Sequence, residues 1–246
     1  MTLNLGPAHH ALLMGWLAQE AVRVLGPIPS DDLLRDAVRR YGQERGSRMA
    51  QRALARGHTL SWTSFMAYKE WSAPDHPHSS ETLATTPHWR MRVTRCPWND
   101  AWQAEGLGAY GRYYCRDIDL AVVQGFNPAL GLSVGHTLPE GSEGCEFAYT
   151  EYTLDSEEEV RLDALRGQLG DKVVMPWSYH LGHLYWTVRR VFEEHTGAAG
   201  QAIAERALRR WEERFGTEAA DTIRGHEKTD WRTPPDRESK SSSCEE

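Results

Sequence analysis

The sequence has few cysteines, no long hydrophobic run and no cluster of positive charge, and each absence excludes a class of protein. Four cysteines in 246 residues are too few for a disulfide scaffold, so we expect reduced thiols. No window approaches about 18 uninterrupted apolar residues, and the N-terminal segment lacks the basic and apolar parts of a signal peptide. A net charge of −7 without a Lys/Arg run argues against nucleic acid as a partner. We therefore expect a cytoplasmic protein with a small-molecule substrate, no nucleic-acid partner and no membrane partner.

Motifs that would indicate a nucleotide or a metal are also missing. The chain contains no P-loop and no HExxH pattern, and the spacing of its cysteines fits no common zinc ribbon or finger. His180 and His183 are three residues apart on a predicted helix, so both could reach one site. No third ligand follows at a recognisable spacing, which favours hydrogen-bonded core histidines over a metal pair. We expect no metal and no cofactor.

Hydrophobic periodicity predicts helices at both ends of the chain. Apolar residues recur at helical spacing from His10 to Val24, where Gly26 and Pro27 interrupt the pattern, and Ser30 is placed to cap a second helix. Residues 72–87 are rich in proline and serine and predict a loop. Towards the C-terminus the pattern predicts three more helices, over residues 155–166, 177–194 and 198–223.

The middle of the chain holds three of the four cysteines between Arg95 and Tyr149. Residues 89–94 alternate apolar and polar side chains, as a half-buried strand does, and Cys96 follows the end of this strand. The apolar spacing of residues 107–118 predicts a helix with Cys115 on its apolar face. Cys145 alternates with polar neighbours on a second predicted strand. The three thiols can therefore converge, although they come from different elements.

These patterns together predict an α+β fold with a central antiparallel sheet, Cys-bearing strands, and flanking helical hairpins from both termini. We expect residues 1–225 to form a single domain, made of helical residues 1–71, an α/β core over 88–155 and helical residues 156–225. Residues 226–246 have little to bury and are expected to be disordered. Amphipathic helices such as residues 188–214 can form a homodimer interface, although packing within the core explains them equally well.

A cysteine in this region acts as a nucleophile, a metal ligand or a small buried hydrophobe. For Cys115 and Cys145 an ordinary buried thiol is an equally good interpretation. Cys96 lies at the end of a predicted strand, and such ends often border a cleft. A nucleophilic role there requires a lowered pKa, for which Arg95 or a nearby histidine is a candidate source. Asp119, four residues after Cys115, is either a carboxylate directed into the interior or part of a solvated helix end.

The order of these motifs is similar to that of a known family. Cys96-Pro97, Tyr114-Cys115 with Asp119, Gly125-Phe126-Asn127-Pro128 and Gly144-Cys145-Glu146-Phe147 together resemble the L-2-amino-thiazoline-4-carboxylic acid hydrolase domain family. The resemblance covers roughly residues 10 to 225, and its specific part is the segment of 55 residues from Arg95 to Tyr149. The last of the four motifs is also similar to the vinyl-reductase-like domains that sense small molecules.

The hydrolase resemblance implies water addition to a cyclic amidine-like carbon and expulsion of the ring sulfur. Such a site needs a base or a thiolate, an acid for the ring, and a cation or amide donors for a substrate carboxylate. Candidates at the matching positions are Cys115 or Cys96 as the thiol, Asp119 as base or amidine anchor, Asn127 as a hydrogen-bond partner, Arg95 for the carboxylate, and Cys145 as pocket wall.

Further substrate contacts are expected from Trp98, His180 and His183. Trp98 is one of ten tryptophans, and those near the core motifs suggest an aromatic pocket larger than a thiazoline acid needs. The substrate can then be another cyclic amide or amidine, since a shared fold does not fix the reaction. The alternative is a binding or sensing domain that uses the same pocket without turnover.

Overall fold

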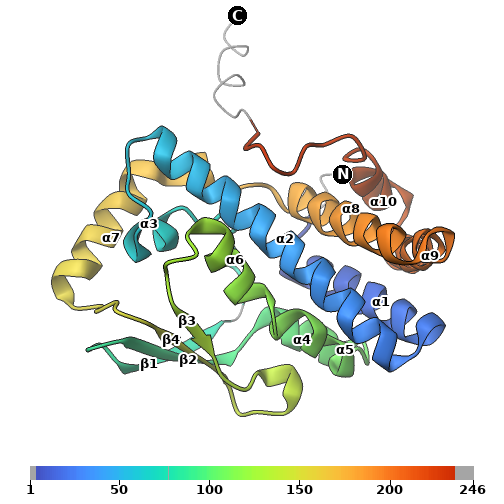
Figure 1. Ribbon diagram of the computed structural model, residues 1–246, viewed down its shortest axis with the longest axis horizontal. Coiled ribbons are helices and arrows are strands. Elements are labelled where there is room, and N and C mark those ends of the chain that lie inside the picture. The colour runs from blue at the N-terminus through green and yellow to red at the C-terminus, as the bar shows by residue number, and fades with distance from the viewer. Residues whose placement is uncertain (1–3, 77, 236–246) are drawn as a thin grey trace, which may run out of the picture.

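The computed structural model describes residues 4–76 and 78–235. A four-stranded antiparallel sheet lies along one side of a larger layer of helices (Figure 1), which confirms the predicted α+β class. The strands are β1 (Ser79–Ala84), β2 (Trp89–Arg95), β3 (Leu132–Val134) and β4 (Cys145–Tyr149). The longer helices are α1 (Pro7–Leu25), α2 (Pro27–Ala55), α7 (Ser156–Leu169), α8 (Trp177–Thr196) and α9 (Ala198–Phe215). Shorter helices are α3 (Trp62–Ala67), α4 (Pro97–Ala104), α5 (Gly108–Cys115), α6 (Ile118–Phe126) and α10 (Thr217–Arg224).

The sheet has the order β1-β2-β4-β3, and every neighbouring pair is antiparallel. In its register Val93 of β2 lies opposite Cys145 of β4, so both side chains share one face. Only Cys145 lies within a strand, because Cys96 precedes the first turn of α4 and Cys115 is the last residue of α5. The prediction of Cys-bearing strands is therefore confirmed for Cys145 alone.

Strand β1 occupies part of the segment in which a loop is predicted. All but one of its residues are exposed, and it pairs with β2 along an edge of the sheet. Because neither face of β1 is buried, its sequence shows no alternation of apolar and polar residues. The periodicity on which a strand prediction depends is missing for this reason.

Helix α2 extends along most of the helical layer (Figure 1). It begins immediately after α1, because Gly26 adopts a φ of 83° and Pro27 occupies the first helical position. Ser30 lies inside α2, where its hydroxyl donates to the carbonyl of Gly26 at 2.7 Å, so the predicted capping role is wrong. The helix continues without interruption past Gly46.

Helix α6 packs against α2 at unusually close range. A Cβ atom on Gly46 would collide with the backbone of Val122 and Phe126, and one on Gly125 would collide with the backbone of Gln43. Glycine at these positions lets the two helix backbones touch. The contact fixes α6 against α2 and thereby fixes the relative position of the side chains that both helices carry.

The C-terminal helices complete the core on the other side of α2. The helix predicted over residues 198–223 is divided at Gly216, whose φ is 89°, into α9 and α10. Beyond them Trp231 is 1% exposed and its carbonyl accepts a hydrogen bond from Arg48 at 2.5 Å. The prediction of disorder from residue 226 does not account for this packing, and residues 236–246 lie outside the described residues. Among the described helices, none combines the length and apolar character that crossing a membrane requires.

Candidate active site

A cavity of about 220 Å³ lies between the helices α2, α4, α5 and α6 and the strands β2 and β4. It brings together residues that are far apart in the sequence. The lining residues are Arg45, Trp71, His78, Val93, Cys96, Trp98, Tyr114, Cys115, Ile118, Asp119, Val122, Thr137, Cys145 and Phe147. All three cysteines of the described residues and Asp119 therefore face one space.

The three thiols reach the cavity from three different elements. Cys145 begins β4, and its Sγ accepts a hydrogen bond from the Leu138 amide at 3.2 Å. Burial raises the pKa of Cys145 to about 11, although this amide lowers it. Burial also raises the pKa of Cys96, and it raises the pKa of Cys115 well above its usual range. At neutral pH all three are neutral thiols, which are hydrogen-bond donors and weak acids rather than nucleophiles.

Asp119 is in the first turn of α6 and is half-buried. Its carboxyl group forms no hydrogen bond and no ion pair within the described part of the chain. Burial raises the pKa of Asp119 to about 6, while the positive charges of Lys69 and Arg45 lower it. A carboxyl group with this pKa exchanges a proton readily near neutral pH, as a general base or acid must.

Lys69 lies near Asp119 but does not line the cavity. Burial lowers the pKa of Lys69 to about 8, and the charge of Asp119 raises it. The lysine is therefore mostly protonated at neutral pH and favours the ionised form of Asp119.

Two residues with predicted substrate contacts lie elsewhere. The Asn127 side chain donates to the carbonyl of Leu60 at 2.8 Å and accepts from the amide of Ala129 at 3.0 Å, so it ends α6 and fixes the following turn. Arg95 is exposed and forms an ion pair with Asp100 at 3.0 Å. Neither side chain is among those that line the cavity.

His180 and His183 are buried on α8 and also lie outside the cavity lining. His180 bonds through Nε2 to the carbonyl of Glu70 at 3.0 Å, and His183 Nε2 bonds to Glu44 at 2.8 Å. Burial lowers the pKa of His180 to about 3 and that of His183 well below its usual range. Within residues 4–76 and 78–235, no three His, Cys, Asp or Glu side chains are grouped so that they could hold a metal ion.

Trp98 does line the cavity, and its orientation depends on a residue that the sequence analysis does not identify. Its Nε1 donates to Nδ1 of His10 at 3.1 Å. His10 must then carry its proton on Nε2, which is 2.9 Å from the hydroxyl of Tyr41. Burial lowers the pKa of His10 well below its usual range, so this neutral form is maintained.

Arg45 and Trp71 also line the cavity, although no sequence motif predicts this. Arg45 follows Tyr41 by four residues on the same helix, so this basic residue lies on the buried face of α2. A charged residue at a position where the helical pattern predicts an apolar one is the sequence signal that could have identified it. Trp71 follows α3 in an irregular segment, where no periodicity indicates the direction of its side chain.

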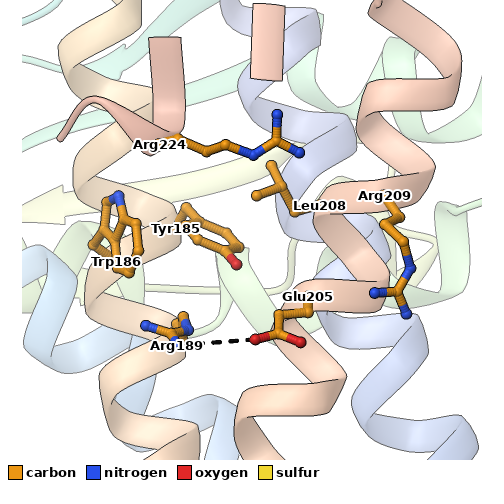
Figure 2. Close-up of a pocket in the computed structure, with 7 residues that line it drawn as sticks. All are labelled: Tyr185, Trp186, Arg189, Glu205, Leu208, Arg209 and Arg224. Atoms are coloured by element: carbon orange, nitrogen blue, oxygen red, sulfur yellow. Dashed lines mark ion pairs between the residues drawn. The ribbon is translucent and has the colours of Figure 1, made fainter. Parts of the chain in front are cut away.

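A second cavity of about 240 Å³ lies between α8, α9 and α10 and is lined by Tyr185, Trp186, Arg189, Glu205, Leu208, Arg209 and Arg224 (Figure 2). Arg189 forms an ion pair with Glu205 at 3.9 Å, and Arg224 forms one with Asp221 at 2.8 Å. Its lining contains no thiol, and its one carboxylate is paired. The thiols and the carboxyl group that lacks an ion pair in the described part of the chain therefore lie in the first cavity.

Two glycine patterns lack the structural context of the motifs they match. Residues 131–135 read GLSVG, but Ser133 is an exposed residue within β3 rather than at a turn from strand to helix. Residues 106–111 read GLGAYG, but they join two helices and do not follow a strand. Neither forms a nucleophile elbow or a dinucleotide-binding turn.

The model of one protein family, described as L-2-amino-thiazoline-4-carboxylic acid hydrolase, matches residues 8–149. Searches of curated proteins and of solved structures gave no significant match. All residues that line the first cavity lie between residues 45 and 147, within the matched range. The match covers more than half of the chain, and the chain belongs to the L-2-amino-thiazoline-4-carboxylic acid hydrolase family.

Proposed function

We propose that the protein hydrolyses a small thiazoline-type heterocycle and that Asp119 is the general base. The observation that carries this proposal is the placement of Asp119, whose pKa is raised by burial to about 6, in one cavity with three neutral thiols. The family supplies the class of reaction, and this cavity supplies groups that fit it.

The reaction can be written with these groups. Asp119 removes a proton from water while the oxygen bonds to the carbon between the ring nitrogen and sulfur, and it passes this proton to the ring nitrogen. The carbon then bears a hydroxyl group, two nitrogens and the ring sulfur. Asp119 removes the hydroxyl proton as the carbonyl forms and the bond to sulfur breaks, and it returns this second proton to the departing sulfur. The product is a carbamoyl derivative with a free thiol.

We assign the thiols of Cys115 and Cys96 to hydrogen bonding with the substrate rather than to attack on it. Desolvation opposes ionisation of both. A neutral thiol can donate a hydrogen bond to the ring nitrogen or sulfur as charge develops there. Cys145, whose sulfur already accepts a backbone hydrogen bond, is assigned to the cavity wall.

The size of the cavity supports a small substrate. Its volume of about 220 Å³ is below the range of roughly 300–1,000 Å³ typical of sites for drug-sized ligands. Trp98, Tyr114 and Phe147 provide flat apolar walls that suit a small ring. The tryptophans near the core motifs therefore do not require a substrate larger than a thiazoline acid.

The test is turnover of 2-amino-thiazoline-4-carboxylate, and of a panel of cyclic amidines and lactams, by purified protein with and without a chelator. We expect hydrolysis by the wild type, a loss of about 100-fold or more in Asp119→Asn, and smaller losses in Cys115→Ala and Cys96→Ala. Asp100→Asn is the matched control, because this aspartate is exposed and, among the described residues, pairs only with Arg95.

The binding-domain alternative has its own outcome in this experiment. If the wild type turns over no member of the panel while a ligand still raises its melting temperature, the cavity binds without catalysis. If a folded Asp119→Asn variant retains full activity, the role of Asp119 as base is wrong.

A further inference from the structure

Arg45 lies in the wall of the cavity, and no carboxylate of the described residues forms an ion pair with it. It lies on α2 and only 5% of its surface is exposed. Within the described residues Arg45 forms no ion pair with any carboxylate. Arg48 and Arg52, one and two turns further along α2, both bond to the carboxylate of Glu70. Arg45 is thus left as a buried cation facing the cavity.

The contacts of Arg45 hold its guanidinium in place but leave donors free. One terminal nitrogen donates to the hydroxyl of Tyr41 at 3.2 Å. The guanidinium carbon lies 4.2 Å from the centre of the Trp71 ring and 5.2 Å from that of Tyr41. The Nε atom is buried and has no hydrogen-bond partner in the part of the chain that the structure describes. A buried, unsatisfied donor on a charged group is costly unless a ligand satisfies it.

We propose that Arg45 binds the carboxylate of the substrate. This inference rests on the proposed function, since it takes the cavity of Asp119 as the substrate site. A carboxylate matches the planar fork of a guanidinium and can accept two hydrogen bonds from it. The contact of the guanidinium with the Trp71 ring limits the movement of the fork and thereby of a bound carboxylate.

Arg95, the arginine that the sequence suggests for this role, is less suited to it. Arg95 has a side chain that is 56% exposed and already pairs with Asp100. Water competes for such a guanidinium, and an exposed ion pair contributes little to binding. Arg45 combines burial, a free donor and a place in the cavity wall.

Binding can be tested without turnover. The probes are 2-aminothiazole-4-carboxylate, whose aromatic ring resists hydrolysis, and its 4-carboxamide, and the measurement is isothermal titration calorimetry. We expect the wild type to bind the acid at least 10-fold more tightly than the amide. Arg45→Met should weaken binding of the acid by about 10- to 100-fold and leave that of the amide within a few-fold.

Two further variants keep the result interpretable. Arg45→Lys retains the charge and loses the fork, so we expect an intermediate affinity for the acid even if Arg45→Met fails to fold. Arg95→Met is the matched control and should bind both probes as the wild type does. Equal affinity of the wild type for acid and amide, or no binding of either, overturns the proposal, as does an unchanged affinity in a folded Arg45→Met.

The two proposals can fail separately. If the protein hydrolyses the thiazoline but does not bind the acid more tightly than the amide, the proposed function stands and the role of Arg45 is wrong. If it prefers the acid through Arg45 but hydrolyses nothing, the role of Arg45 stands and the proposed hydrolase function is wrong.

Discussion

At the scale of single residues, burial raises the pKa of both the carboxyl group and the thiols of the cavity, with opposite consequences for their reactivity. It raises the pKa of Asp119 to about 6, which is close to the pH at which a general base works best. It also raises the pKa of the thiols, which moves them away from the ionised form at neutral pH. One environment therefore favours base catalysis by a carboxylate and disfavours attack by a thiolate.

The activity should depend on pH through Asp119. Below pH 6 the carboxyl group is protonated and cannot accept a proton from water, so we expect kcat/KM to rise with pH and level off above an inflection near pH 6. The measurement is the pH dependence of kcat/KM, with Asp100→Asn as the control that retains the inflection. Persistence of the same inflection in Asp119→Asn would assign it to another group.

The thiols should react slowly with alkylating reagents. Because the thiolate is the reactive form, each unit by which the pKa is raised lowers the rate of alkylation at neutral pH about tenfold. We expect iodoacetamide to modify Cys96, Cys115 and Cys145 more slowly than free glutathione at pH 7, with rates that rise as pH increases. Peptide mass spectrometry measures each site, and fast modification of Cys115 would restore the nucleophile hypothesis.

Part of the cavity lining can be predicted from the sequence, because it comes from residues that are close together along the chain. Cys115 and Asp119 are four residues apart, and the alternation of residues 145–149 identifies the inward face of β4. Arg45 and Trp71 reach the cavity through tertiary packing, which no short-range spacing encodes. The motif residue Asn127 is found in a turn, where its hydrogen bonds explain its presence.

At the scale of secondary-structure elements, the position of α6 depends on glycine. Gly46→Ala places a methyl group against the backbone of Val122 and Phe126, which cannot move as a side chain can. We expect a loss of at least about 1–3 kcal/mol in the free energy of unfolding, together with a loss of activity, because α6 carries Asp119. Chemical denaturation and the hydrolysis assay provide the two measurements.

A matched substitution separates this effect from helix propensity. Gly167 lies on the exposed side of α7, with no atom near its added Cβ. Gly167→Ala should therefore stabilise the protein by about 0.5–1 kcal/mol. If Gly46→Ala is equally stabilising, the close contact between α2 and α6 is not as tight as described.

The elements show where periodicity fails as a guide. The apolar spacing of residues 107–118 predicts one helix, but the chain turns between α5 and α6 at Arg116 and Asp117. Asp117 is buried there and pairs with Arg39 at 2.9 Å and Arg116 at 2.8 Å. Asp117 thus pairs with a residue 78 positions away, a contact that a local pattern cannot show.

At the scale of the whole molecule, a buried network of charges joins the N-terminal and C-terminal helices. Glu70 is fully buried and accepts hydrogen bonds from Arg48 and Arg52. Although burial alone would raise the pKa of Glu70, the two arginines lower it to about 2. His183 of α8 lies 3.2 Å from Arg48 and thus connects this network to the second half of the chain.

This network should make stability depend on pH. The folded-state pKa of Glu70 lies below its value in the unfolded chain, so its contribution is present above about pH 4.5 and is lost as pH falls towards 2. Glu70→Gln should lower the free energy of unfolding at pH 7 by about 3–5 kcal/mol and weaken its dependence on pH in that window. Denaturant unfolding from pH 2 to 7 measures both effects. Exposed Glu213→Gln is the control, and a loss of the same size there would contradict the assignment.

The general composition of the chain predicts a substantial core, and the structure has one. Trp231 packs instead with Met175 and Tyr179 in a second, smaller buried cluster, which the composition does not predict. A single tryptophan in a polar segment shows no periodicity, and its partners, Tyr179 and His183, lie about 50 residues earlier. Packing of this kind is decided by the completed fold.

The burial of Trp231 has a practical consequence for producing the protein. A recombinant chain cut at Gly225 to remove a polar tail would delete the ring that stacks on His183 with centroids 4.8 Å apart, and the carbonyl that Arg48 contacts. Water would then enter beside the arginine and the glutamate, and the shortened product should be recovered in inclusion bodies more than in solution. Expression vectors and crystallisation trials should therefore keep the chain at least through Pro235.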